Sequence, residues 1–309
     1  MSGGVGTRQR FNDFWLGVFF AWVRWAPGTA RWARPAAVAL AWRAAGGMRR
    51  AVRANLRRVL GAEATAAEID RTGRAVVGSF YDFVCEVGAN HDRPLSDLVR
   101  RIASVEGKEA YLAARAERRG AVLVTAHFGN FEVGLAAMRE VEERVHVVFR
   151  RDRQTHFERL RSELHRSLGV IETPIDDGVA SWLALRDALA SDAVVMLQGD
   201  RSEPGQKSVA VPFAGGTLRL PVGPAKLAMM AGAPLVPVFA LRVAEDAENE
   251  GGKVRIVLGE PIEVADAGAV ESAVNRVAAA IEERVRRRPE QWHVLEKAFV
   301  EDRESDRVS

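Results

Sequence analysis

Cysteine is almost missing from this sequence, because its 309 residues include only Cys85. A single thiol excludes a disulfide-stapled fold and any zinc or iron–sulfur site built from a cysteine cluster, and it fits a reducing compartment. The sequence also lacks an uncharged apolar run of the roughly 18 residues that a membrane-spanning helix needs. Hydrophobic residues (48%) and charged residues (28%) occur in ordinary proportions, so we expect a folded chain rather than a disordered or collagen-like one.

Positive charge is concentrated at the N-terminal end of the chain. The net charge is only +3, but residues 1–60 contain eleven arginines, no lysine and a single acid, Asp13. The rest of the chain is therefore mildly acidic. A basic end on an acidic body predicts an anionic partner for that end, which is either nucleic acid or acidic phospholipid.

Tryptophan is concentrated in the same segment and favours the phospholipid. Five of the seven tryptophans lie in the first 42 residues. Phe11, Trp15, Val18, Trp22 and Trp25 recur at helical spacing, and tryptophan flanked by arginine is typical of a helix that lies in a membrane interface. We expect peripheral binding to an anionic membrane surface and no nucleic-acid partner. The alternative is an amphipathic core helix with a solvated basic face.

Further along the chain, strand patterns alternate with helical patterns. Short apolar runs rich in β-branched residues predict strands at 121–125, 145–149, 193–197, 234–240 and 254–258. Helical patterns fall between most of them, at 131–143, 153–168, 178–190 and 222–231. Such alternation predicts an α/β fold whose central, mostly parallel sheet is flanked by helices.

Helices alone are predicted before this region, and one more after it. Residues 9–60 read as helices broken near Pro27 and Gly46, and helix 66–90 starts with a capping box of Thr65 and Glu68. A last helix covers 268–288. We therefore divide the chain into a basic, Trp-rich, helical membrane-associating segment (1–65), an α/β domain (66–300) and a polar tail (301–309).

The stretch from Val122 to Glu132 is the most informative for chemistry. His127 and Glu132 are five residues apart, so they would not meet on a straight helix or on a strand. Gly129 and Asn130 supply a turn between a strand end and a helix start, which would let Glu132 accept a ring N–H from His127 and raise its basicity. The nearby backbone N–H groups could bind an oxyanion. The alternative is an ordinary loop histidine beside a helix whose dipole Glu132 favours.

A histidine oriented by a carboxylate can deprotonate a hydroxyl. The sequence contains no Gly-x-Ser-x-Gly elbow, and Cys85 lies far upstream in a helical pattern, so the hydroxyl is expected to be the substrate's own. The other histidines lack metal-ligand spacing such as His-Glu-x-x-His, so we expect no metal.

Two pairs of charged residues follow predicted strands. Arg150 and Arg151 are candidates for phosphate contacts, although they also fit a solvated charge run. Asp200 and Arg201 could reach the same edge of the sheet as His127, and their alternative is a surface ion pair.

The segment His127-Phe-Gly-Asn-Phe-Glu132 resembles the His-x4-Asp/Glu block of the lysophospholipid acyltransferase superfamily, in particular that of the lipid A biosynthesis (lauroyl/myristoyl) acyltransferases and related bacterial glycolipid acyltransferases. Further segments resemble blocks of the same family in the same order. They are Arg53-Ala-Asn-Leu56, Val147-Val-Phe-Arg-Arg151, Leu197-Gln-Gly-Asp-Arg201, Val211-Pro-Phe-Ala-Gly215, Ala233-Pro-Leu-Val-Pro237 and Pro289-Glu-Gln-Trp292.

This resemblance implies a glycerolipid acyltransferase-like fold and a membrane-associated O-acyltransferase. His127 would be the general base, held by Glu132, with Gly129, Asn130, Arg150, Arg151, Asp200 and Arg201 binding substrate. The donor would be a thioester of acyl carrier protein or coenzyme A, with no metal or other cofactor, and the location the cytoplasmic face of the bacterial inner membrane.

The acceptor stays open among lipid A-like lipids, glycolipids of the phosphatidylinositol mannoside type and other polar lipids. Two other functions also stay open. One is a lipid ester or thioester hydrolase that uses His127 on water, and the other is a non-catalytic protein that binds lipid or nucleic acid.

Overall fold

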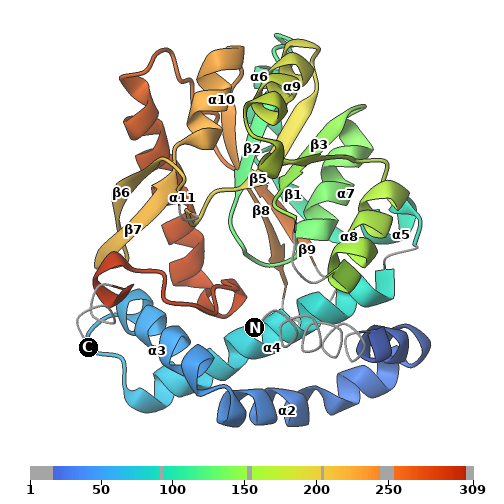
Figure 1. Ribbon diagram of the computed structural model, residues 1–309, viewed down its shortest axis with the longest axis vertical. Coiled ribbons are helices and arrows are strands. Elements are labelled where there is room, and N and C mark those ends of the chain that lie inside the picture. The colour runs from blue at the N-terminus through green and yellow to red at the C-terminus, as the bar shows by residue number, and fades with distance from the viewer. Residues whose placement is uncertain (1–16, 91–92, 152–154, 203–204, 244–253, 304–309) are drawn as a thin grey trace, which may run out of the picture.

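The computed structural model describes residues 17–90, 93–151, 155–202, 205–243 and 254–303 (Figure 1). Phe11, Trp15 and the rest of the predicted helical segment before residue 17 lie outside this part. The described helices are 17–25, α2 (Pro27–Ala44), α3 (Gly46–Leu60), α4 (Ala66–Asn90), α5 (Leu95–Val99), α6 (Lys108–Arg115), α7 (Phe131–Val141), α8 (Thr155–Ser167), α9 (Val179–Ala190), α10 (Gly223–Ala231) and α11 (Ala269–Arg287), with 3₁₀ turns η1 (Ile175–Asp177) and η2 (Pro289–Gln291).

A mostly parallel sheet forms the centre of the molecule. Its strands are β1 (Ile102–Glu106), β2 (Ala121–Thr125), β3 (Val145–Phe149), β4 (Ile171–Pro174), β5 (Val194–Gln198), β8 (Leu235–Arg242) and β9 (Val254–Leu258), in the order β1-β9-β8-β2-β5-β3-β4. Strand β2 pairs in parallel with β5 and β8, and β3 with β5 and β4. Only the β8–β9 pair in this sheet, among the described strands, is antiparallel. The predicted fold class is confirmed.

Helices cover both faces of the sheet. Along β2, Val122 and Val124 point into a core built with α9, α10 and α11, whereas Ala121 and Leu123 point into a second core built with α5, α7 and α8. This alternation follows from the two-residue repeat of a strand, and burial on both faces explains why residues 121–124 are all apolar.

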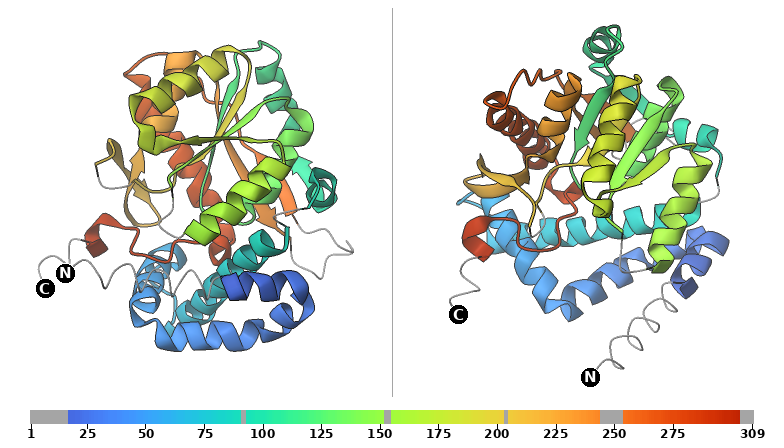
Figure 2. Two further views of the ribbon diagram at one scale, coloured as in Figure 1. Left: turned by 45° about the vertical axis from the view of Figure 1, so that its right-hand side comes forward. Right: turned by 45° about the horizontal axis from the view of Figure 1, so that its top comes forward.

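Helices α2, α3 and α4 form a further layer at the carboxyl edge of the parallel strands (Figures 1 and 2). The helix breaks predicted near Pro27 and Gly46 are confirmed, because α2 starts at Pro27 and α3 at Gly46. Trp42 is buried in this layer and lies over Gly73 of α4, where any side chain would collide with its ring. The capping box is also present, since Thr65 Oγ1 accepts from the N–H of Glu68 and a Glu68 carboxylate oxygen accepts from the N–H of Thr65.

Some elements were not predicted. Edge strands β1 and β4 are largely exposed or half-buried, and helices α5 and α6 are short. A hairpin of β6 (Ser208–Phe213) and β7 (Gly216–Pro221) forms a separate two-stranded sheet. No helix in the described ranges combines the length and apolarity needed to cross a membrane.

Candidate active site

The parallel register of β2 and β5 brings His127 next to Asp200. Thr125 pairs with Gln198 at the ends of these strands, so residues 127 and 200 both lie two positions beyond a matched pair. The Nδ1 atom of His127 lies 2.7 Å from Oδ1 of Asp200. Because an ionised carboxylate can only accept, Nδ1 carries the proton and Nε2 keeps its lone pair, which is the tautomer that a general base needs.

Asp200 is a buried carboxylate whose two oxygens both have partners. Its second oxygen, Oδ2, accepts a hydrogen bond from the indole N–H of Trp292 at 3.1 Å. Burial acts to raise the pKa of Asp200, but the charge of His127 and these hydrogen bonds outweigh it and lower that pKa to about 2. Asp200 is therefore ionised throughout the physiological pH range.

The other ring nitrogen of His127 faces a cation. Nη2 of Arg201 lies 3.3 Å from Nε2 of His127, and Nη1 of Arg201 lies 3.1 Å from a carboxylate oxygen of Glu296. The side chain of His127 is 25% exposed, so Nε2, which contacts Arg201, is also within reach of a substrate. The sequence placed Arg201 at this edge of the sheet, and the structure confirms that it lies beside His127.

The predicted pairing of His127 with Glu132 is wrong. Glu132 is buried on the first turn of α7, and its carboxylate lies 3.1 Å from Nε2 of His165 on α8. The opposite ring nitrogen of His165 lies 2.7 Å from Glu172 of β4. The turn at Gly129 and Asn130 does exist, but it sends His127 toward β5 and Glu132 toward α8.

The turn itself is held by the chain around it. The N–H of Gly129 donates to the carbonyl of Gln291 (3.0 Å), and the N–H of Asn130 donates to that of Ala240 (2.8 Å). Gly129 has φ +65°, and an added side chain would collide with the Ala240 carbonyl. Both amides are occupied, so they are not the oxyanion donors that the sequence predicted.

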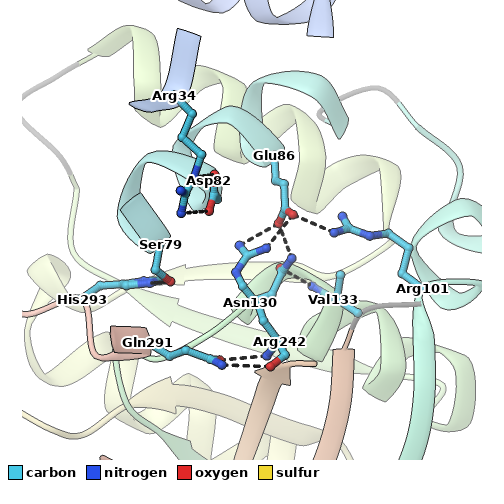
Figure 3. Close-up of polar contacts among 10 residues, drawn as sticks. All are labelled: Arg34, Ser79, Asp82, Glu86, Arg101, Asn130, Val133, Arg242, Gln291 and His293. Carbon is cyan, nitrogen blue, oxygen red and sulfur yellow. Dashed lines mark hydrogen bonds and ion pairs between the residues drawn. The ribbon is translucent and has the colours of Figure 1, made fainter. Parts of the chain in front are cut away.

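Asn130 and Glu86 connect this turn to the helical layer (Figure 3). The side chain of Asn130 caps α7 by accepting from the N–H of Val133, and it donates to the carboxylate of Glu86 on α4. Arg242, at the end of β8, binds Glu86 through two hydrogen bonds of 2.6 and 2.8 Å, and Arg101 adds a third at 2.7 Å. Burial acts to raise the pKa of Glu86, but the two arginines outweigh it and lower that pKa.

Residues 291–293 lie beside the turn. The N–H of His293 donates to the carbonyl of His127 (2.7 Å), and the Gln291 side chain bonds to the backbone N–H and carbonyl of Arg242 (2.8 and 2.9 Å). The His293 ring lies 2.9 Å from Ser79 Oγ, and burial lowers its pKa to about 3, so it is neutral. No role was predicted from the sequence for Glu86, Arg242 or Trp292. The Pro289–Trp292 block was a signal that could have pointed to Trp292.

Arg150 and Arg151 contact a neighbouring acidic turn. Arg151 makes hydrogen bonds of 2.9 and 3.2 Å with Asp177, and Arg150 lies 3.5 Å from Asp176. Among the described contacts, neither arginine touches His127 or Asp200. Both are half-exposed at the end of β3, two strands away from β2.

A small apolar cavity lies beside Gly199, the residue before Asp200. Its lining includes Val124 of β2, Gly199 next to Asp200, Pro224 of α10 and Leu235 of β8, and it contains no charged side chain. Within the residues that the structure describes, no group of three or more His, Cys, Asp or Glu side chains is arranged to hold a metal ion.

Comparisons with known proteins identify the family of the chain. A phosphatidylinositol mannoside acyltransferase of Mycobacterium tuberculosis is 30% identical over 264 residues, which make up 81% of this chain and 77% of that protein. A protein of the same name from Mycolicibacterium smegmatis is 28% identical over 191 residues, covering 61% and 60% of the two chains. The profile of the bacterial lipid A biosynthesis acyltransferases matches residues 7–301. The chain is an acyltransferase and belongs to the bacterial lipid A biosynthesis acyltransferase family.

Proposed function

We propose that the protein moves a fatty acyl chain from a thioester to a hydroxyl group of a glycolipid of the phosphatidylinositol mannoside type, on the surface of a membrane. The observation that carries this proposal is the 2.7 Å contact of His127 with a buried, ionised Asp200, which leaves Nε2 of His127 ready to accept a proton. The acceptor class is drawn from the names of the relatives.

The reaction is a direct transfer between the two substrates. Nε2 of His127 takes the proton of the acceptor hydroxyl while the oxygen attacks the thioester carbonyl. Asp200 stabilises the imidazolium that forms. The tetrahedral intermediate then collapses, the carbon–sulfur bond breaks, and the imidazolium returns its proton to the departing thiolate. The acyl donor is the thioester of acyl carrier protein or coenzyme A, and the residues need no metal or other cofactor.

Charged side chains supply the rest of the chemistry. Arg201 is the cation nearest Nε2 among the described contacts, so it is positioned to meet the oxyanion. Arg150 and Arg151 lie farther along the same edge of the sheet and are suited to the phosphate of a lipid headgroup or of the donor.

The helical layer carries the membrane contact. Trp32, Ala36 and Leu40 follow one another at four-residue steps on the outer side of α2, and Trp32 and Leu40 are 86% and 68% exposed. Trp25 is 83% exposed at the end of the preceding helix. Arg31 and Arg43 are also exposed on α2, in the row of residues at four-residue steps (31, 35, 39 and 43) that lies next to the row of Trp32, Ala36 and Leu40. This composition fits a helix that rests on an anionic leaflet, which we take to be the cytoplasmic face of the inner membrane.

The test is an acyl-transfer assay with purified protein and either acyl-CoA or acyl-carrier protein. With phosphatidylinositol mannosides as acceptor, mass spectrometry should find one added acyl group, in the presence of EDTA as well as without it, and His127→Gln should abolish the product. Free fatty acid released at the same rate without acceptor would instead identify a hydrolase. If neither product forms with any polar lipid, the proposed function is wrong.

A further inference from the structure

We propose that Trp292 is a positioning residue of this acyltransferase: its indole N–H holds the carboxylate of Asp200 in the orientation that serves His127. This inference rests on the proposed function for its catalytic consequence. Its structural part concerns only how Asp200 and His127 are held, and it can be tested without substrate.

The first argument is the hydrogen bonding of Asp200. Oδ1 binds Nδ1 of His127 and Oδ2 binds Nε1 of Trp292, and the side chain of Asp200 is completely buried. A buried carboxylate oxygen without a donor is costly, because water cannot replace the missing partner. Without the indole N–H, the carboxylate would lower its free energy by rotating or shifting toward another donor. Nδ1 of His127 would then lose its fixed partner.

The second argument is that the indole has little freedom to move. The ring of Trp292 is 3% exposed and packs against the rings of Phe213 (5.7 Å between centroids) and Phe299 (6.5 Å). Its backbone forms an isolated antiparallel bridge with Phe128, the residue after His127. A donor fixed in this way can fix its acceptor in turn.

The third argument is that the same short segment touches both members of the pair. Residue 292 binds Asp200 through its side chain, while the N–H of His293 binds the His127 carbonyl at 2.7 Å. Asn55 of α3 secures the chain just beyond, with its amide donating to the carbonyls of Val294 (3.3 Å) and Glu296 (2.8 Å) and accepting from the N–H of Ala298 (3.0 Å). The segment is therefore built to hold the distance between Asp200 and His127.

Removing the N–H has a definite structural consequence. Oδ2 of Asp200 turns toward another donor, so the hydrogen bond between Oδ1 and Nδ1 of His127 is weakened or lost. The imidazole is then no longer held with its proton on Nδ1, and in part of the molecules the proton is on Nε2, where it blocks the general base.

The experiment compares three variants of the full-length protein with the wild type. Trp292→Phe removes the donor and keeps an aromatic ring. Replacement of Trp292 by 3-benzothienylalanine exchanges only the N–H for sulfur, so it keeps the packing if the phenylalanine variant folds poorly. Trp182→Phe, at a half-buried tryptophan that packs against Gly223, is the matched control.

The first readout is the ¹H–¹⁵N NMR spectrum of the His127 ring, assigned with His127→Gln, which reports which ring nitrogen carries the proton. We expect the Nδ1–H tautomer in the wild type and in Trp182→Phe, and a mixture of the two tautomers in both Trp292 variants. The second readout is the steady-state kinetics of acyl transfer, with kcat roughly tenfold lower in the Trp292 variants and KM little changed.

Failure of the inference and failure of the proposed function are distinguishable. An unchanged His127 tautomer in the benzothienyl variant overturns the role of Trp292, whatever the activity. A mixture of tautomers in the Trp292 variants of a protein that transfers no acyl group to any lipid supports the positioning of Asp200 and rejects the proposed reaction.

Discussion

At the scale of single residues, two buried carboxylates each bind a histidine. Asp200 binds His127 and Glu132 binds His165. Sequence reasoning paired His127 with Glu132 because they lie five residues apart, whereas Asp200 is 73 positions away. The order of strands in the sheet decides which carboxylate lies close to His127. That order cannot be predicted from the residues around His127 alone. The available signal was that His127 and Asp200 each follow the end of a buried strand.

This assignment predicts different outcomes for the two carboxylates. Asp200→Asn should lower kcat by about 10²–10⁴, because the amide cannot stabilise the imidazolium and can hold the wrong tautomer. Glu132→Gln should leave the chemistry closer to normal but lower the free energy of unfolding by about 3 kcal/mol, because it leaves His165 without one of its counter-charges.

Steady-state kinetics and urea unfolding of both variants check this prediction. Glu163→Gln, on the more exposed side of α8, serves as the control for a neutralised glutamate. The assignment would have to be reversed if Glu132→Gln abolished activity in a fully stable protein while Asp200→Asn remained active.

At the scale of elements, periodicity was informative wherever an element is buried or amphipathic. Strands 121–125, 145–149 and 254–258 were predicted with the bounds that the structure has, because they are short, mostly apolar runs rich in β-branched residues. Strands β1 and β4 were not predicted, because they lie at the two edges of the sheet, where few apolar side chains are needed. The β6–β7 hairpin was also not predicted. Among the described strands, β6 and β7 pair only with each other.

Three elements are joined by one buried cation. His165 of α8 lies between Glu132 of α7 and Glu172 of β4. Burial acts to lower the pKa of His165, but the charge of Glu132 and the hydrogen bonds with both glutamates outweigh it and raise that pKa to about 9. This contact therefore contributes its full stability only below the ordinary histidine pKa of about 6.5, and the contribution is lost as the pH rises toward 9.

We accordingly expect the free energy of unfolding to fall by up to about 3 kcal/mol between pH 6.5 and 9. Urea denaturation at intervals across this range measures the slope. In His165→Gln the slope should flatten, since no proton is left to lose. An equal slope in the variant and the wild type would assign the pH dependence to other groups.

At the scale of the whole molecule, the described part of the basic end predicted from the sequence belongs to a layer packed on the α/β body. Trp42 is buried under α4, so removing the N-terminal helices would expose core side chains. The described residues of the predicted aromatic stripe do not share one environment. Trp22 is half-buried and its indole N–H donates a hydrogen bond to Thr29, whereas Trp25 is exposed. Point substitutions on the outer face are therefore the appropriate test of membrane binding.

The double variant Trp32→Ser, Leu40→Ser should bind vesicles containing anionic phospholipid at least about tenfold more weakly than the wild type, because the lost apolar area is what enters the interface. Binding should also weaken with salt. Vesicle sedimentation measures both effects. Val179→Ser, at an equally exposed apolar residue on α9, should bind like the wild type. Equal binding by the double variant would remove α2 from the interface.

The hydrogen bonds from residues 291–293 also set an order of events during synthesis. His127 and Asp200 leave the ribosome long before Gln291, yet the turn and the carboxylate are held by that late segment. A nascent or prematurely terminated chain that stops short of this segment would contain both His127 and Asp200 but lack the hydrogen bonds that hold them in place. We therefore expect such a chain to transfer acyl groups more slowly than the complete enzyme.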